Sequence, residues 1–311
     1  GKLINESLLS ELSRNQAGKN ILAIIVDWLS LFSLIFLCQK FFSWPLYVIT
    51  FFLIGTRMQA LGLMAHEGVH YKLVDNKRVN DWLADILICW PLFINVQGYR
   101  NEHFPHHNFT HDKKRDPDLI RKVDQKEWHF PKRNFSLFKL FFLDCVGRYF
   151  FQFPKRVLFS FGYRKKREKK SFKGREVFQV FVTIIFFLVL YRSQVWKEYI
   201  LYWILPFFTI FKGLRRLRTM AEHFSIPGEG RSRTVFTNGI ERLLFAPHNT
   251  NYHGEHHLYP NVPYHNLKKL HEALFQNPGI SSHISYTKGY TGVLKEVSQL
   301  KGFSPVRTSM I

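Results

Sequence analysis

The apolar residues of this chain gather in long blocks that polar segments separate. Residues 21–38 form one block with a single charged residue, Asp27, and residues 44–64 form a second with only Arg57. A helix needs about 20 mostly apolar residues to cross the core of a bilayer. Because only a short link joins the two blocks, they predict a hairpin of two membrane-spanning helices.

Two shorter apolar blocks, residues 177–191 and 199–211, flank a polar tip and predict a second hairpin. Each is shorter than a full span, so flanking residues must extend it or it stays partly at the membrane surface. Residues 82–96 and 135–161 are rich in aromatic side chains but carry scattered charges. They predict helices lying at the membrane interface, with buried core helices an equally good interpretation.

A basic segment lies between the two predicted hairpins, because residues 162–175 contain eight lysines and arginines. Loops of this kind stay on the cytoplasmic side, and two hairpins that cross and return leave everything outside their tips on that same side. The predicted fold class is all-α: an integral membrane protein with about four transmembrane helices in two hairpins and a cytoplasmic helical cap. We expect one domain over residues 1–311, with hairpins over 21–64 and 177–211 and the remaining segments, 66–175 and 212–311, forming the cap.

Composition agrees with apolar blocks set among polar ones, since 46% of residues are hydrophobic while the mean hydropathy is only −0.14. The formal net charge of +21 suits nucleic acid, anionic lipid headgroups or an acidic protein, and its sign does not choose among them. The three cysteines, Cys38, Cys89 and Cys145, form no CxxC pair and predict buried free thiols. We expect no signal peptide, because no short apolar segment precedes a small-residue cleavage site.

Histidines carry the candidate chemistry, since nine of the 15 fall into four tight groups. Residues three and four apart share a helix face, so the HxxxH and HxxHH spacings each aim imidazoles into one sector. An isolated histidine is usually a hydrogen-bonded structural residue, which is our expectation for His129 and His248 and, with less force, for His111. The clustering reverses that preference and predicts these metal ligands: His66, His70, His103, His106, His107, His223, His253, His256 and His257.

Each cluster also has a neighbouring glutamate: Glu67, Glu102, Glu222 or Glu255. Adjacent residues face different sides of a helix, so these carboxylates are not expected to bind the same ion as the histidines beside them. One of them could accept the N–H of an imidazole from another segment and fix its tautomer, although solvated glutamates are an equal alternative.

Helix-breaking residues predict where two of the clusters sit. Pro105 predicts that the helix of the second cluster begins close to Glu102, because proline is tolerated only in a first turn. Gly254 and Pro260 predict a short helix or turn for the last cluster.

Neutral imidazole suits iron, zinc or copper, and nine of them could hold two ions with open positions. A redox metal beside a bilayer could use dioxygen to oxidise a saturated carbon that no acid, base or nucleophile activates. Two other classes remain open. Residues 66–70 match HExxH, the signature of a zinc protease, but such a site leaves both HxxHH groups unexplained. A membrane metal carrier would place histidines within its spans rather than beside them.

At this point the motifs resemble the membrane fatty acid desaturase and hydroxylase superfamily, whose members carry three histidine boxes. The similar segments run from about Gly62 to His271. They are residues 66–70, then 103–107 followed by Thr110 and Asp116-Pro117-Asp118, then 253–260 followed by Pro263, Leu267 and His271. Glu222-His223 looks like the extra ligand that precedes the third box.

The resemblance implies a four-span helical anchor, a di-iron centre that uses dioxygen, and a membrane lipid or acyl chain as substrate. It implies a separate electron donor, a ferredoxin or a b-type cytochrome, since no HPGG motif occurs in the chain. Nucleic acid is not an expected partner. His253 stands where front-end desaturases carry Gln, which disfavours that subgroup. Desaturation, and hydroxylation of a lipid or carotenoid, both remain possible at this stage.

Overall fold

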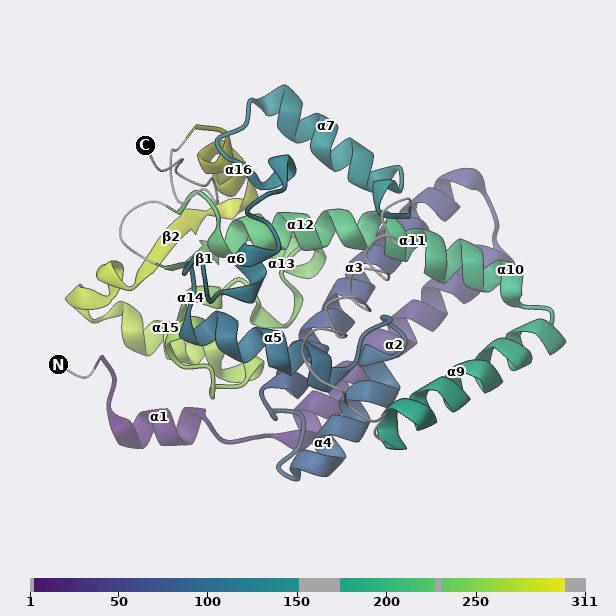
Figure 1. The fold of residues 1–311 in the computed structure, drawn as a ribbon, viewed down its shortest axis with the longest axis horizontal. Coiled ribbons are helices and arrows are strands. Elements are labelled where there is room, and N and C mark those ends of the chain that lie inside the picture. The colour runs from purple at the N-terminus through teal and green to yellow at the C-terminus, as the bar shows by residue number, and fades with distance from the viewer. Residues whose placement is uncertain (1–2, 151–173, 227–230, 300–311) are drawn as a thin grey trace.

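The computed structural model describes residues 3–150, 174–226 and 231–299, and these residues are mostly helical. Figure 1 shows two regions: long helices on the right, and a cap of short helices and two strands on the left. This division is consistent with the predicted membrane-spanning helices and cap. The predicted basic segment, residues 162–175, lies outside the described residues except for its last two positions.

The first hairpin consists of α2 (Ala17–Lys40) and α3 (Trp44–Val69), which confirms the two predicted helices. Helix α2 extends beyond its predicted block at both ends, and α3 extends beyond its block at the C-terminal end. Ser43 caps α3 by accepting the N–H of Leu46. The two charged residues that interrupt the apolar blocks meet, since Arg57 Nη1 lies 3.5 Å from Asp27 Oδ1. His248 Nε2 from the cap lies 2.7 Å from Asp27 Oδ2. Charges that would be costly inside a membrane are thus paired with one another.

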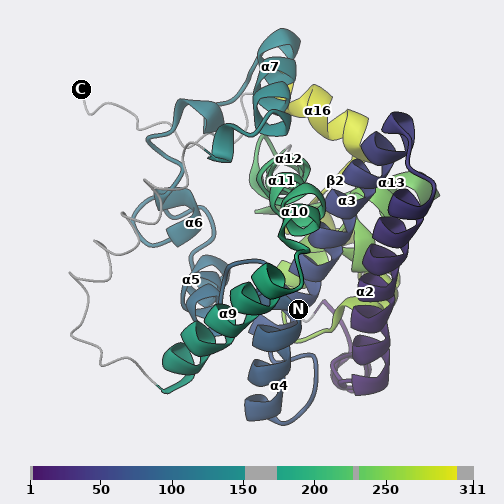
Figure 2. The same ribbon diagram turned by 90° about the vertical axis from the view of Figure 1, so that its right-hand side faces the viewer.

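The second hairpin begins with α9 (Gly174–Arg192), which confirms the prediction over residues 177–191. The chain returns through α10 (Trp196–Tyr199), the π-helix η3 (Ile200–Ile204) and α11 (Leu205–Phe208). The tips of both hairpins meet where Tyr47 donates to the Leu201 carbonyl at 3.2 Å. Figure 2 shows α9 on one side of this region and α2 on the other.

Three helices among the described residues are long and apolar enough to cross a membrane: α2, α3 and α9. The returning arm of the second hairpin is helical, but Thr209, with φ −116° and ψ −94°, separates it from α12 (Ile210–His223). The fourth span therefore remains a prediction. Helix α3 packs closely against the start of α12, because a Cβ on Gly55 would lie 2.4 Å from Ile210 Cγ2.

The cap differs from the predicted all-α class because it contains two strands. Strands β1 (Ser232–Phe236) and β2 (Ile284–Lys288) pair in parallel, with Thr234 opposite Tyr286. Each strand has five residues, too few for a clear alternating pattern, and the pairing joins segments far apart in sequence. The described residues are mostly helical, as predicted, and these two short strands are the part that was not expected.

The remaining helices of the cap are short. They are α1 (Glu6–Leu12), α4 (Lys77–Ala84), η1 (Asp85–Cys89), α5 (Val96–Asn108), α6 (Pro117–Ile120), η2 (Lys126–Trp128), α7 (Asn134–Cys145), α13 (Gly239–Leu244), η4 (Pro247–Asn249), α14 (His253–Leu258), η5 (Tyr264–Asn266), α15 (Leu267–Phe275), η6 (Pro278–Ser282) and α16 (Gly289–Gln299).

Three further predictions need correction. The segment 82–96 is not one helix, because the chain turns after η1 and α5 starts at Val96, whose N–H donates to Asp85. Helix α5 also starts six residues before Glu102, capped by Asn95, so Pro105 lies inside it and removes one hydrogen bond near its end. Cys145 is exposed, whereas Cys38 and Cys89 are buried free thiols as predicted. Of the segment 135–161, residues 151–161 lie outside the described part of the chain.

Candidate metal centre

Four helices bring the nine predicted ligands together. His66 and His70 lie at the end of α3, and His223 is the last residue of α12. The second cluster lies on α5, and the third on the six-residue helix α14, which confirms the predicted short helix. Because each cluster occupies the end of its helix or a very short helix, its imidazoles extend beyond the apolar packing toward a common point.

Five imidazoles form one group, which we call the five-histidine group: His66, His70, His103, His107 and His256. One ligand nitrogen from each lies within 4.8 Å of all the others. His103 Nε2 lies 2.9 Å from both His70 Nε2 and His107 Nε2. His256 Nε2 lies 3.1 Å from His107 Nε2. This packing of nitrogens, drawn from α3, α5 and α14, surrounds a single small volume.

The other four imidazoles form the four-histidine group: His106, His223, His253 and His257. His223 Nε2 is its centre, at 3.1 Å from His106 Nε2 and 2.8 Å from His253 Nε2. His257 belongs with His106 and His223, since their ligand nitrogens lie within 4.8 Å of one another. A carboxylate oxygen of Glu222 lies within 4.8 Å of a ligand nitrogen of both His223 and His253.

The two groups adjoin because sequence neighbours divide between them. His106 and His107 are adjacent on α5, and His256 and His257 are adjacent on α14, yet one of each pair belongs to each group. The rings of His107 and His257 stack across the boundary, with centroids 4.2 Å apart. The arrangement is one centre with two neighbouring positions.

Burial favours the neutral form of seven of these imidazoles. It lowers the pKa of His70 to about 3, with Lys72 and Arg100 adding to the effect, and the pKa of His107 to about 2. Burial, followed by repulsion from neighbouring imidazoles, lowers the pKa well below its ordinary value for His103, His223, His253, His256 and His257. A neutral imidazole keeps the lone pair that binds a metal.

Two observations test whether these residues fit metal ions. His66 Nε2 and His257 Nε2 are buried without a hydrogen-bond partner in the described structure, which is costly unless a cation uses their lone pairs. The closest Nε2 atoms within the two groups lie 2.8–3.1 Å apart. With metal–nitrogen bonds of about 2.1 Å, two nitrogens at this separation can bind the same ion.

Carboxylates support the four-histidine group from outside. His106 Nδ1 lies 3.0 Å from Asp116 Oδ1, and His253 Nδ1 lies 3.4 Å from Glu222 Oε1. Asp116 in turn accepts the backbone N–H groups of His111, at 3.0 Å, and Asp118, at 2.9 Å. Carboxylates in this position fix the tautomer and the orientation of a ligand imidazole.

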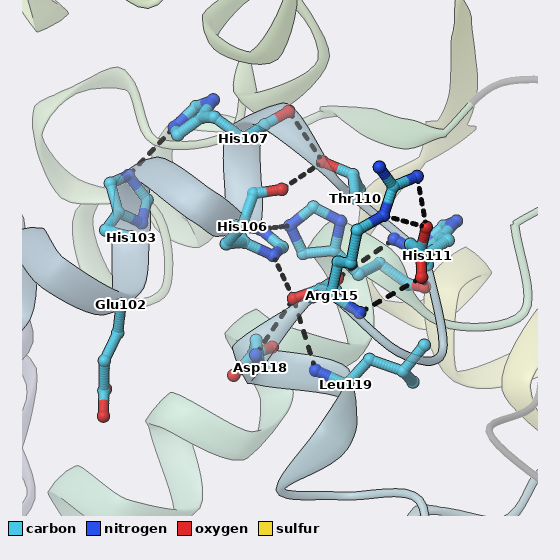
Figure 3. A network of polar contacts seen from close by, with 12 residues as sticks. Glu102, His103, His106, His107, Thr110, His111, Arg115, Asp118 and Leu119 are labelled. Atoms are coloured by element: carbon cyan, nitrogen blue, oxygen red, sulfur yellow. Dashed lines mark hydrogen bonds and ion pairs between the residues drawn. The ribbon is translucent and has the colours of Figure 1, made fainter. Parts of the chain in front are cut away.

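The four glutamates beside the clusters thus have different roles. Glu222 supports a histidine from another helix, as the sequence allowed, and it also lies close enough to be a ligand, which the sequence argument did not expect. Glu255 binds His271, and Glu67 accepts the N–H of Tyr264 at 3.1 Å. Glu102 pairs with Arg121 at the surface and points away from the imidazoles in Figure 3.

Two histidines outside the clusters have partners of the kind expected for isolated histidines. His129 lies 3.0 Å from the Val123 carbonyl, and His248 pairs with Asp27. His111, at φ +68°, belongs to neither group; its Nε2 lies 3.1 Å from the His223 carbonyl, and it stands beside Arg115 in Figure 3.

Comparison with known proteins agrees with this geometry. The profile of the family described as "Fatty acid desaturase" matches residues 42–287, which is most of the chain. The protein belongs to the fatty acid desaturase family. The chain is also 26% identical over 274 residues to the dihydrorhizobitoxine desaturase of Bradyrhizobium elkanii, a match that covers 83% of this chain and 78% of the relative.

Membership of the desaturase family favours an oxidoreductase over the zinc protease that residues 66–70 suggest. The geometry agrees, because the Glu67 carboxylate is buried and already accepts the N–H of Tyr264, whereas a protease keeps that carboxylate free to activate water. Asp116 is the supporting residue that the sequence argument missed. A signal was present, since Asp116-Pro117-Asp118 is part of the similar segments, but no local rule assigned the carboxylate to His106.

Proposed function

We propose that this desaturase holds two iron ions and removes two hydrogens from neighbouring saturated carbons of an acyl chain. The carrying observation is that nine imidazoles, seven of them buried and two half-buried, divide into two adjoining groups, one of five and one of four centred on His223. The proposed ligands are His66, His70, His103, His107 and His256 for one ion, and His106, His223, His253 and His257 for the other. One zinc ion needs only three or four protein ligands, so this number argues against a single zinc.

The irons, once bound, would supply dioxygen chemistry: one O2, two electrons, two protons and the two substrate hydrogens give a double bond and two waters. The residues of the chain hold the ions and keep bulk water away from them. Asp116 and Glu222 orient His106 and His253 and raise their basicity as ligands. A separate one-electron carrier, a ferredoxin or a b-type cytochrome, would supply the electrons.

Metal analysis of purified, active protein tests the proposal. About two irons per chain are expected, with activity that follows iron content. A deuterated saturated acyl chain should lose deuterium as a double bond forms. Gain of an oxygen atom from labelled dioxygen would assign hydroxylation instead, and one tightly bound zinc with proteolysis lost on Glu67→Gln would assign the protease.

The substrate has a second candidate because of the named relative. Its name specifies dihydrorhizobitoxine, so a small molecule of that kind is an alternative to a fatty acyl lipid. Lipid analysis of cells with and without active enzyme distinguishes the two. A new double bond among the acyl lipids supports the first, and conversion of added dihydrorhizobitoxine with unchanged lipids supports the second.

We also propose that the metal centre faces the cytoplasm. Helices α2 and α9 both run from the cap to hairpin tips that lie together at Tyr47 and Leu201. Cysteines placed at Lys114 in the cap and at Gln194 in the second tip, in a background with Cys145 replaced, should label from opposite sides of the membrane. Labelling of both from one side would overturn the two-hairpin arrangement.

A further inference from the structure

Strand β1 is one of the two strands that no sequence pattern predicted, and it contacts two of the helices that carry the proposed ligands. It packs against both α12, which ends at His223, and α14, which carries His253, His256 and His257 (Figure 1). Arg233 and Thr234 are adjacent on this strand, and both are 0% exposed. The burial of an arginine and a threonine hydroxyl at this position requires specific partners.

Arg233 binds the end of α12. Its guanidinium donates to four carbonyls, those of Met220 and Ala221, both at 3.0 Å, Phe224 at 3.0 Å and Ser225 at 2.7 Å. These carbonyls surround His223, the last residue of the helix. The end of a helix leaves carbonyls without intrahelical partners, and a cation there is favourable. Glu296 neutralises the guanidinium at 2.9 Å.

Thr234 binds α14 through two contacts. Its hydroxyl donates to the Glu255 carboxylate and accepts the N–H of Gly254 at 3.2 Å. The other oxygen of Glu255 lies 2.6 Å from His271 Nδ1, so the buried carboxylate is held from both sides. The contact is close, because a Cβ on Gly254 would lie 2.9 Å from the Thr234 hydroxyl and 2.3 Å from Ile284 on β2.

Helix α14 cannot hold itself in place by its own hydrogen bonds. It has six residues, and its N-terminus has no side-chain cap. Isolated helices of this length are unstable in water. The position of His253, His256 and His257 therefore depends on what α14 packs against, and Glu255 and Gly254 are the residues between them that contact β1.

We propose that β1 is a positioning strand. Arg233 fixes the position of His223 at the end of α12, and Thr234 fixes the position of the histidines on α14. The strand thereby holds two ligand segments from different parts of the chain at one separation. The inference rests on the proposed metal function. Neither residue contacts a ligand nitrogen, so both are positioning residues. Loss of the Thr234 hydroxyl should weaken metal binding more than the accompanying loss of stability explains.

Thr234→Val tests this directly, because valine keeps the shape and removes the hydroxyl. Iron affinity, measured by competition with a chelator, should fall, but by less than the roughly 10- to 100-fold that losing a direct hydrogen-bond partner of a ligand imidazole costs. The Mössbauer spectrum of the bound iron should change as well. Thr234→Ser keeps the hydroxyl and should restore both. If Thr234→Val does not accumulate in membranes, Thr234→Ala is used in the same comparison.

Thr56→Val is the matched control. Thr56 lies on α3, is 1% exposed, and its hydroxyl donates to the Leu53 carbonyl of the same helix at 2.7 Å. It should leave both the iron affinity and the iron spectrum unchanged. Wild-type affinity and spectrum in Thr234→Val, with only a lower melting temperature, would overturn the positioning role. Wild-type protein that binds no iron would instead overturn the proposed function, and the inference with it.

Discussion

The two imidazole groups share helices and burial but differ in what surrounds them. In the four-histidine group, Asp116 and Glu222 approach the outer nitrogens of His106 and His253 at 3.0 and 3.4 Å. In the five-histidine group, the nearest carboxylate contact among the described residues is Glu67 Oε1, 3.9 Å from His66 Nδ1. A carboxylate on the outer nitrogen makes an imidazole a stronger ligand. Two ions held here would therefore not be equivalent.

Replacing adjacent histidines on α14 gives the largest expected effect and tests whether the groups are separate. His256→Ala removes a ligand of the five-histidine group, and His257→Ala removes one of the four-histidine group. Each should abolish turnover and reduce iron from about two to about one per chain. His107→Ala should behave like His256→Ala.

His129→Ala is the control for these ligand variants. His129 bonds the Val123 carbonyl and belongs to neither imidazole group, so its loss should leave turnover intact. Membrane levels of all variants must be comparable, since metal binding and folding are coupled. Unchanged turnover in both α14 variants would contradict the shared centre.

Metal removal should destabilise the protein, because both groups then contain buried imidazoles with no cation. A metal at a thousand times its dissociation constant stabilises a protein by about 4 kcal/mol, so the apoprotein should melt at a clearly lower temperature. Its stability should also fall as the pH drops below about 6.5, the ordinary histidine pKa. Unfolded histidines then take up protons that folded His70, with a pKa of about 3, and His107, with a pKa of about 2, do not. Thermal unfolding of chelated protein between pH 5 and pH 8 measures this, and a stability that is independent of pH would contradict the buried neutral imidazoles.

Asp116→Asn sharpens the difference between the groups. The change removes the charge but keeps the size of the side chain that binds His106 Nδ1. Iron in the four-histidine group should bind about 10- to 100-fold more weakly, while the ion in the five-histidine group is little affected. Glu222→Gln should act on the same ion. Equal weakening of both ions, seen by titration with a chelator, would show that the groups respond as one unit.

Glu102→Gln should have the smallest effect, although Glu102 is adjacent to His103. Its carboxylate pairs with Arg121 at the surface, where both side chains are about half exposed, at 52% and 46%. Exposed ion pairs contribute less than about 1 kcal/mol, so turnover and iron content should match the wild type. A large loss of iron would mean that adjacency in sequence, rather than contact, governs these carboxylates.

The sequence predicted those parts of the protein that depend on local periodicity. Apolar blocks of sufficient length predicted α2, α3 and α9, and the spacing of three or four residues predicted that His66 and His70, and the members of each HxxHH box, share a helix. Gly254 and Pro260 predicted the short helix that carries the last histidine cluster, which is α14. The family followed from the same motifs, because the chemistry requires many imidazoles in fixed local patterns.

Tertiary structure decided which imidazoles belong together, which acids support them and what holds them in place. His106 and His107 are neighbours in sequence yet join different groups, because the helices that approach α5 from two sides determine the partner of each. Asp116 reaches His106, and Arg233 reaches the end of α12, across loops that no periodic pattern describes. The paired strands β1 and β2 join segments far apart in the chain, and five residues are too few to signal such pairing alone. Local hydrogen bonding and apolar spacing are encoded within a few residues, whereas the separation between ligands is set only when distant segments pack.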